Sequence, residues 1–370
     1  MSASSDSSSA QDLPFPRIVS SAGTSMTTRS ARAERIASEF AQPAPSLLVD
    51  RHGRAHRDLR VSLTDRCNLR CSYCMPAEGL AWLPAPTLLT TGEMVRIGQL
   101  LVGLGITEVR LTGGEPLLRP DAADIVHAFS SLGVEVSLTT NGLRLPALAS
   151  SLADAGLSRV NVSLDTLVRE RFTTITHRDR LPDVLAGLAA AKAAGLSPIK
   201  INTVLVPGVN DDEAPALLEW ALENDFRLRF IEQMPLDAQG AWSRELMVTA
   251  EQILESLSSR FSLVELPLRG SAPAEEWWVN GGPATVGIVA SVTRPFCGSC
   301  DRLRLTADGQ LRNCLFAREE SDLRTPIRDG ASDAELTDRI LACVAGKRPG
   351  HGIDEPGFLQ PPRPMSAIGG

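Results

Sequence analysis

Between residues 59 and 232 the sequence alternates between short runs of β-type residues and longer amphipathic segments. Strands that alternate with helices in this way form βα units, whose strands are parallel because each helix carries the chain back across the sheet. We therefore predict an α/β fold with a partial (β/α)6 barrel of the TIM type. The expected strands are 59–64, 106–111, 134–139, 159–164, 199–206 and 227–232, and the expected helices are 91–104, 121–132, 146–155, 182–194 and 212–224.

The rhythm changes after residue 235, where strands become shorter and more closely spaced. We expect helices near 249–259, 322–328 and 333–345, with strands at 261–266, 276–279, 285–290, 302–306 and 310–315. Such a segment is too small for a second barrel and is predicted to be an α+β cap. The domain prediction is a disordered extension at 1–46, the barrel at 47–235, the C-terminal domain at 236–345 and a Gly/Pro-rich tail at 346–370.

Composition excludes several classes of function. The 370 residues have a formal net charge of −7, which gives no reason to expect binding to nucleic acid. The sequence has no apolar run long enough to cross a bilayer and no secretory signal pattern, so we expect a cytoplasmic protein that binds no membrane. Seven cysteines in such a chain indicate metal ligation in a reducing compartment.

Three of these cysteines follow the first expected strand within eight residues: Cys67, Cys71 and Cys74. Each iron of a four-iron cluster normally takes one cysteine, so three thiolates leave the fourth iron open to a ligand that is not protein. A structural zinc ion is the alternative, but it requires a fourth cysteine or histidine nearby. We therefore predict a [4Fe–4S] cluster with one open iron.

A second trio consists of Cys297, Cys300 and Cys314. It also lacks a fourth thiol in its segment, and a second open [4Fe–4S] cluster fits best, while zinc with a distant histidine remains the alternative. The remaining cysteine, Cys343, lies in an amphipathic helical pattern and is predicted to be buried.

Polar and flexible residues accompany these trios. Gly113 and Gly114 follow the second strand, where paired glycines let the backbone approach a ligand closely. Arg302 and Arg304 alternate along a strand and therefore share a face. Arg60 and Arg110 could join them from the rim of the barrel. One guanidinium group can bind two phosphate oxygens at once. Four arginines in an otherwise acidic chain therefore predict a triphosphate site.

The segment from Cys67 to Cys74, followed by Thr112–Pro116, resembles the signature of the radical S-adenosylmethionine (SAM) superfamily. With the second trio, residues 47–370 resemble the GTP 3′,8-cyclase family, also called molybdenum cofactor biosynthesis protein A. The stretches that carry this resemblance are Leu59–Cys67, Thr139–Gly142, Arg159–Asp165, Lys200–Asn202, Arg229–Pro235 and Phe296–Arg302.

The resemblance implies a role for individual residues. Two [4Fe–4S] clusters and SAM would be the cofactors. The residues implied for SAM are Tyr73, Gly114, Ser163 and Met234. Those implied for GTP are Arg60, Arg110, Thr139, Lys200, Arg302, Leu303 and Arg304. Those implied for catalysis are Arg302, Arg304, Gly369 and Gly370.

The resemblance also implies the reaction and its partners. A 5′-deoxyadenosyl radical derived from SAM would remove the hydrogen from carbon 3′ of GTP, and this carbon would bond to carbon 8 of the guanine. The implied partners are an electron donor such as flavodoxin or ferredoxin and the downstream cyclic pyranopterin monophosphate synthase, with a homodimer as a further expectation. Another radical SAM enzyme, for example one that modifies peptides, and a non-enzymatic metal-binding module are the alternatives.

Overall fold

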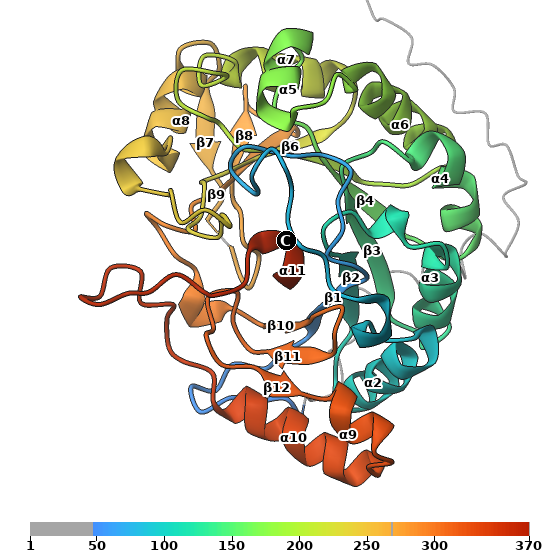
Figure 1. Cartoon of the computed structure of the whole chain (residues 1–370). Helices are drawn as coiled ribbons and strands as arrows, with labels where there is room; N and C mark the ends of the chain where they lie inside the picture. Colours follow the sequence, from blue (N-terminus) through green and yellow to red (C-terminus); the bar gives the residue numbers. More distant parts are fainter. Residues whose placement is uncertain (1–46, 268, 370) are drawn as a thin grey trace, which may run out of the picture. The chain divides into compact units, whose positions relative to one another are not determined.

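The computed structural model describes residues 47–267 and 269–369. The extension predicted to be disordered and the proposed catalytic Gly370 lie outside these ranges. The six strands predicted for the barrel are present within a few residues of their expected limits and are all parallel (Figure 1). They are β1 (Asp58–Ser62), β2 (Glu108–Thr112), β3 (Glu135–Thr140), β4 (Arg159–Ser163), β5 (Ile199–Thr203) and β6 (Arg227–Ile231).

Strands from the C-terminal segment join this sheet at both edges instead of forming a separate sheet. β10 (Arg302–Leu305) pairs in parallel with β1, and β9 (Thr285–Val289) pairs in parallel with β6. The result is one sheet of order β12-β11-β10-β1-β2-β3-β4-β5-β6-β9-β8-β7. The flanking antiparallel strands are β7 (Leu263–Glu265), β8 (Glu275–Val279), β11 (Gln310–Arg312) and β12 (Ser321–Asp322). The sheet is therefore continuous across residue 235.

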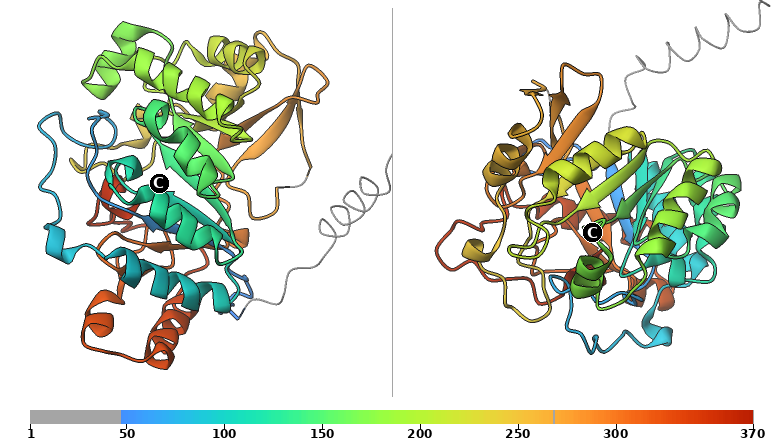
Figure 2. Two further views of the ribbon diagram at one scale, coloured as in Figure 1. Left: turned by 90° about the vertical axis from the view of Figure 1, so that its right-hand side faces the viewer. Right: turned by 90° about the horizontal axis from the view of Figure 1, so that it is seen from above.

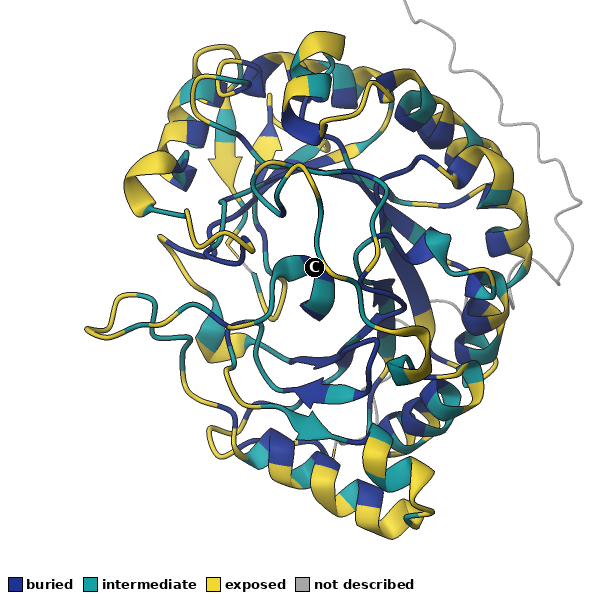
Figure 3. Ribbon diagram, in the orientation of Figure 1, coloured by how far each residue is buried: buried dark blue, intermediate teal, exposed yellow. Residues whose placement is uncertain are grey.

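Strand pleating separates an apolar outer face of the sheet from a polar inner face. Leu59 and Val61 of β1 are buried in the main hydrophobic core, as is Leu303 of β10. Arg60 lies between these two β1 residues and is in register with Arg110 of β2 and Arg304 of β10. The inner face of several strands thus carries cations, while the outer face is apolar. Most of the parallel strands are buried, and the surrounding helices are exposed mainly on their far sides (Figure 3).

Helices cover the outer face of the parallel strands (Figures 1 and 2). The five predicted helices are α2 (Thr91–Gly103), α3 (Ala122–Ser130), α4 (Leu145–Asp154), α6 (Leu181–Ala193) and α7 (Ala214–Glu223); α5 (Arg169–Thr176) was not predicted. A capping box of Thr90 and Glu93 begins α2. Asp121 occupies the N-cap position of α3, but its carboxylate binds Arg119 and Thr91 instead of capping the helix.

The C-terminal segment supplies α8 (Ala250–Ser258), α9 (Arg324–Arg328) and α10 (Asp333–Ala345), close to their expected positions. Cys343 of α10 is buried in the main core, as predicted. Across the described residues, no helix has the length and apolar character needed to span a membrane.

The tail adds an unpredicted short helix, α11 (Met365–Ile368), which lies inside the ring of strands (Figure 1). A second, smaller hydrophobic cluster fixes it there. Ile368 packs with Leu236, from the loop after β6, and with Phe316, from the loop after β11. The amide of Met365 also donates to the Leu236 carbonyl at 2.9 Å. The tail is therefore anchored to both loops that border the interior of the barrel.

Candidate active site

The two glycines after β2 hold the segment that leads into the first thiol trio. The Gly114 amide donates to the Thr64 carbonyl at 2.8 Å, and the Glu115 amide donates to the Arg66 carbonyl at 2.7 Å. A Cβ atom on Gly114 would lie 2.4 Å from the carbonyl oxygens of Asp65 and Arg66. Both of these oxygens belong to the backbone, which cannot move aside as a flexible side chain can. Only glycine therefore fits at this position. The glycine pair thus positions the backbone directly before Cys67.

Glu115, the next residue, is a buried structural carboxylate that joins the ends of β2 and β3. It accepts hydrogen bonds from the amides of Leu117 and Asn141 at 3.0 and 2.7 Å and from the Thr140 hydroxyl at 2.8 Å. Burial raises the pKa of Glu115. Asn141 in turn places its side-chain amide 3.9 Å from the sulfur of Cys67. The carboxylate therefore aligns two strand ends beside the thiols.

The far side of the first cysteine loop is fixed by α5 and β4. The amide of Ser72 donates to the Ile175 carbonyl at 2.8 Å. The Tyr73 hydroxyl donates to Asp165 Oδ2 at 2.8 Å, and the Val204 amide donates to Asp165 Oδ1 at 2.9 Å. Burial raises the pKa of Asp165 to about 6. Asp165 connects the cysteine loop to the ends of β4 and β5, a role that the sequence analysis missed.

The first thiols fit a cluster of cationic irons. Burial raises the pKa of Cys67 to about 11 and that of Cys74 to about 12. Burial also raises the pKa of Cys71, and ionisation of Cys74 and Cys67 raises it further. Such thiols need positive charge to become thiolates, and iron ions supply it. Cys67, Cys71 and Cys74 would therefore hold a [4Fe–4S] cluster.

The second trio is assembled by a hairpin. Cys297 and Cys300 precede β10, and Cys314 follows β11, which is antiparallel to β10 and returns the chain to the same end. Burial raises the pKa of Cys300, but Lys347 and Arg302 outweigh this effect, and the net pKa of the thiol is lowered. Ionised Cys314 and Cys300 add to the effect of burial in raising the pKa of Cys297. These three thiols fit the same kind of cluster.

Neither trio is arranged like a zinc site. A zinc ion holds its ligand atoms about 2.0–2.3 Å from one centre, so the ligands must converge closely. In the part of the chain that the structure describes, no group of three or more His, Cys, Asp or Glu side chains could hold a single metal ion in this way.

A cavity extends from Cys74 to the second trio, and its lining is strongly cationic. Five arginines and only two carboxylates line it; the arginines are Arg60, Arg110, Arg229, Arg302 and Arg304. Both carboxylates already accept hydrogen bonds within the protein. Asp165 accepts one from Tyr73, and Glu232 accepts one from each of three backbone amides. The cavity thus has an excess of positive charge that suits a polyanion.

Burying these charged arginine side chains costs free energy unless an anion lies beside them. Burial first, and neighbouring cations second, lower the pKa values of Arg60 and Arg229. The Nε atoms of both side chains are buried and have no hydrogen-bond partner among the described residues. Asp58 offsets part of the charge, with Oδ2 at 3.3 Å from Arg302 Nε. An anionic ligand would satisfy the remaining donors.

Gly369 lies against the ends of β1 and β2. The Ser62 hydroxyl donates to the Ile368 carbonyl at 2.9 Å, and Arg304 donates to the Gly369 carbonyl. A Cβ atom on Gly369 would lie 2.3 Å from Ser62 Oγ and 2.7 Å from Thr112 Cγ2. The tail thus passes beside the glycine pair and reaches one of the cavity's arginines.

Two family models match this chain. The radical SAM superfamily model covers residues 61–221, and the Molybdenum Cofactor Synthesis C model covers residues 226–353. GTP 3′,8-cyclase of Streptomyces coelicolor is 60% identical over 88% of this chain and 96% of that protein. The chain belongs to the GTP 3′,8-cyclase family. GTP 3′,8-cyclase of Mycolicibacterium smegmatis is likewise 55% identical, over 92% of this chain and 97% of that protein.

Solved structures support the fold of this family member. Streptococcus suis SuiB bound to precursor peptide SuiA aligns over 91% of this chain and 75% of its own, with a TM-score of 0.55 and 12% identity. Native anSMEcpe with bound AdoMet aligns over 80% of this chain and 82% of its own, with a TM-score of 0.54 and 15% identity. At these low identities the likenesses show that the fold is shared.

Most residues expected from the family resemblance line the cavity described above. Those that line it are Arg60, Tyr73, Cys74, Arg110, Thr139, Ser163, Met234, Cys297, Cys300, Arg302, Arg304 and Cys314. Gly114 lies behind the lining, against the cysteine loop. Lys200 of β5 also lies outside the lining, although Arg229 and Arg110 lower its pKa.

Two residues of the site differ from the expectation. Leu303 belongs to the apolar core between Arg302 and Arg304, so only its backbone is left for a GTP contact. Arg229 was not assigned any role, yet it lines the cavity. Gly287 on the adjacent β9 makes room for it, because a Cβ atom there would lie 2.8 Å from Arg229 Cγ. The sequence feature that could have indicated Arg229 is the alternation Arg227-Leu228-Arg229, which places Arg229 on the face opposite Leu228.

Proposed function

We propose that the chain converts GTP into 3′,8-cyclo-7,8-dihydro-GTP, the first step of molybdenum cofactor biosynthesis. The observation that carries this proposal is the arginine-lined cavity between two trios of thiols. When bound, the first cluster and SAM supply a 5′-deoxyadenosyl radical by one-electron cleavage of the sulfonium group. The remaining task of the protein is to hold GTP so that carbon 3′ and carbon 8 can react.

The chain's own residues divide this task. Tyr73, Ser163 and Met234 line the part of the cavity near Cys74 and would contact SAM. Arg60, Arg110, Arg302 and Arg304 would bind the triphosphate through charge-assisted hydrogen bonds, and we extend this role to Arg229. The smaller hydrophobic cluster of Leu236, Phe316 and Ile368 holds the tail beside this space and would exclude water from it.

An anaerobic assay tests the activity. Reconstituted protein incubated with SAM, GTP and a reductant should form 5′-deoxyadenosine and a cyclised nucleotide that retains the triphosphate. SAM cleavage that depends on a peptide and ignores GTP would contradict the proposal and favour the alternative of a peptide-modifying enzyme.

The Arg229→Ala variant should bind GTP about 10- to 100-fold more weakly, because hydrogen bonds to charged groups contribute about 1.5–3 kcal/mol. Equilibrium binding in the absence of SAM measures this loss. Arg227→Ala is the matched control, since Arg227 lies two positions earlier on the same strand and is exposed. Equal affinities of the two variants would exclude Arg229 from the triphosphate site.

The affinity for GTP should also fall as the pH rises through about 8. Burial, with Arg229 second, lowers the pKa of Lys200 to about 8. The protonated amine attracts the triphosphate, so binding is linked to proton uptake, and raising the pH removes that charge. Isothermal titration across this range should show a weaker pH dependence for Lys200→Met than for the parent chain. An identical pH dependence would show that Lys200 does not contact the substrate.

We also propose partners from the chemistry of the reaction. One electron is needed for each cleavage of SAM, and a protein such as flavodoxin or ferredoxin would supply it. The cyclic product would pass to the cyclic pyranopterin monophosphate synthase. A homodimer and a cytoplasmic location remain predictions.

A further inference from the structure

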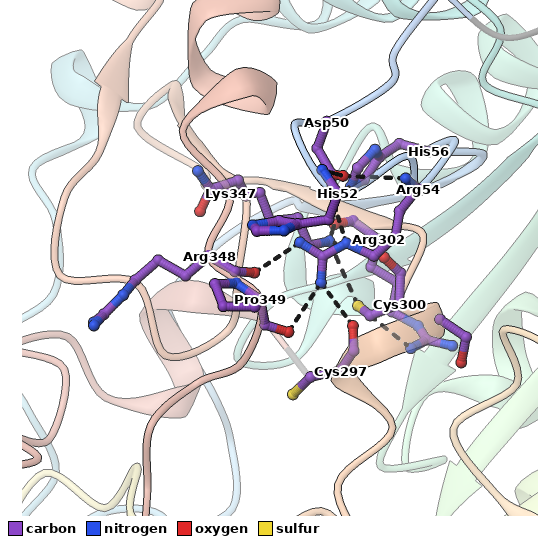
Figure 4. A network of polar contacts seen from close by, with 12 residues as sticks. Asp50, His52, Arg54, His56, Cys297, Cys300, Arg302, Lys347, Arg348 and Pro349 are labelled. Atoms are coloured by element: carbon purple, nitrogen blue, oxygen red, sulfur yellow. Dashed lines mark hydrogen bonds and ion pairs between the residues drawn. The ribbon is translucent and has the colours of Figure 1, made fainter. Parts of the chain in front are cut away.

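Lys347, which follows α10, is a buried lysine that the proposed reaction does not use. Its exposed fraction is 4%, and its ammonium group faces the loop that carries the second trio. Nζ lies 3.2 Å from the Cys300 carbonyl, 2.9 Å from the Arg302 carbonyl and 3.5 Å from the Cys300 sulfur (Figure 4). A lysine ammonium has three donors, and all three are directed at this loop.

Within the part of the chain that the structure describes, the Lys347 ammonium group forms no ion pair with a carboxylate. Burial lowers the pKa of Lys347, and negative charge on the sulfurs of Cys300 and Cys314 opposes this effect. Burying an ammonium group without a counter-charge is costly, so negative charge on these sulfurs would stabilise the arrangement. Such charge is present when the sulfurs are ligands of a cluster.

A second cation keeps Lys347 in place. Arg54 donates to the Cys297 carbonyl at 2.7 Å, to the Pro349 carbonyl at 3.2 Å and to the Arg348 carbonyl at 2.7 Å. Its Nε is bound to Asp50 at 2.6 Å (Figure 4). Arg54 therefore ties the turn at Cys297 to the segment directly after Lys347, which fixes both sides of the contact.

The first trio also has a cation beside it, but this cation contacts the backbone: Arg70 Nη1 donates to the Cys67 carbonyl at 2.7 Å and to the Leu69 carbonyl at 2.8 Å. The side-chain donors to its sulfurs are neutral: the Asn141 amide lies 3.9 Å from the Cys67 sulfur, and the Tyr73 side chain hydrogen-bonds Cys71. At the second trio, Arg302 Nη1 lies 4.0 Å from the Cys300 sulfur in addition to Lys347. Hydrogen bonds and positive charge at ligand sulfurs stabilise the more negative, reduced state of a cluster and raise its reduction potential.

We propose that Lys347 is a positioning residue for the second cluster: its ammonium group holds the Cys300 sulfur and makes this cluster the more easily reduced of the two. The inference deepens the proposed function, because it rests on a cluster at Cys297, Cys300 and Cys314. Lys347 acts through the ligand sulfur and does not contact the substrate.

Redox titration of the anaerobically reconstituted full chain, monitored by electron paramagnetic resonance, tests the proposal. In Lys347→Met the midpoint potential of the second cluster should fall by at least about 59 mV, a tenfold change for one electron. The potential of the first cluster should not change. Lys347→Arg, which keeps the charge, should have a midpoint potential close to that of the parent chain. Arg348→Ala is the matched control, because its side chain is 74% exposed and should have no effect.

The outcomes that overturn the proposal are distinct. An unchanged second midpoint in Lys347→Met, with full iron content, would refute the role of Lys347 while leaving the proposed function intact. Equal shifts of both clusters would also refute it. Loss of half the iron in Lys347→Met but not in Lys347→Arg would support it, whereas the same loss in both would overturn it. A parent chain that binds iron only at the first trio would refute both the cluster assignment and this proposal.

Discussion

The Gly369→Ala variant is expected to lose GTP cyclisation by at least about 100-fold, the effect expected when reacting groups are displaced by about 1 Å. The added Cβ atom would lie 2.3 Å from Ser62 Oγ and 2.7 Å from Thr112 Cγ2. Gly369 also has a φ of 86°, which an alanine adopts poorly. The tail would have to withdraw from Arg304 and from the ends of β1 and β2. The measurement is the rate of formation of the cyclised nucleotide.

Gly357→Ala is the control for this change. Gly357 belongs to the same tail and has a φ of 87°, but among the described residues no atom would lie within 4 Å of a Cβ added there. It therefore shares the backbone cost of the substitution without the steric one, and its activity should stay close to that of the parent chain. Equal losses in the two variants would attribute the effect to tail flexibility and not to the site at Gly369. Iron content and melting temperature should stay near the parent values in both variants.

The Gly114→Ala variant is expected to disrupt the first cluster. Its Cβ atom would lie 2.4 Å from two backbone carbonyl oxygens, those of Asp65 and Arg66, so the chain directly before Cys67 must shift. Overpacking of this kind costs about 1–3 kcal/mol. We expect about half of the iron to be lost, because each trio would hold one of two four-iron clusters. Reductive cleavage of SAM should fall to background.

Iron and sulfide analysis with a SAM-cleavage assay measures this effect. The control is Gly92→Ala in α2, where a Cβ added to the exposed glycine would meet no atom of the described residues within 4 Å. That variant should keep its iron and its activity. Full iron content in Gly114→Ala would contradict a positioning role of the glycine for the cysteine loop, whatever happens to SAM binding.

Much of the site could be predicted from sequence because its chemistry is encoded locally. Cys67, Cys71 and Cys74 lie in one short loop, so their spacing alone indicates a shared cluster. The inner position of Arg60 follows from alternation along one strand, with Leu59 and Val61 on the other face. The limits of β1 to β6 follow from apolar patterns of a few residues.

Other parts could not be predicted because they depend on contacts between distant segments. The sequence showed strands at 285–290 and 302–306, but their parallel pairing with β6 and β1 is a property of the whole sheet. Leu303 was included with its arginine neighbours, although its side chain enters the apolar core. Arg229 was overlooked because alternation along a strand gives the face of a residue but not its burial, and here Gly287 on another strand provides the space.

The sequence by itself determined the predicted ligands, the order of the βα units and the family resemblance, since each depends on residues that are close along the chain. Only the tertiary structure decided what surrounds the ligands. It brought Asp165 to Tyr73, Lys347 to Cys300 and Gly369 to Arg304, across 92, 47 and 65 positions of sequence. The physical reason is that burial and charge balance depend on segments that meet only when the sheet has formed and the tail has packed inside it.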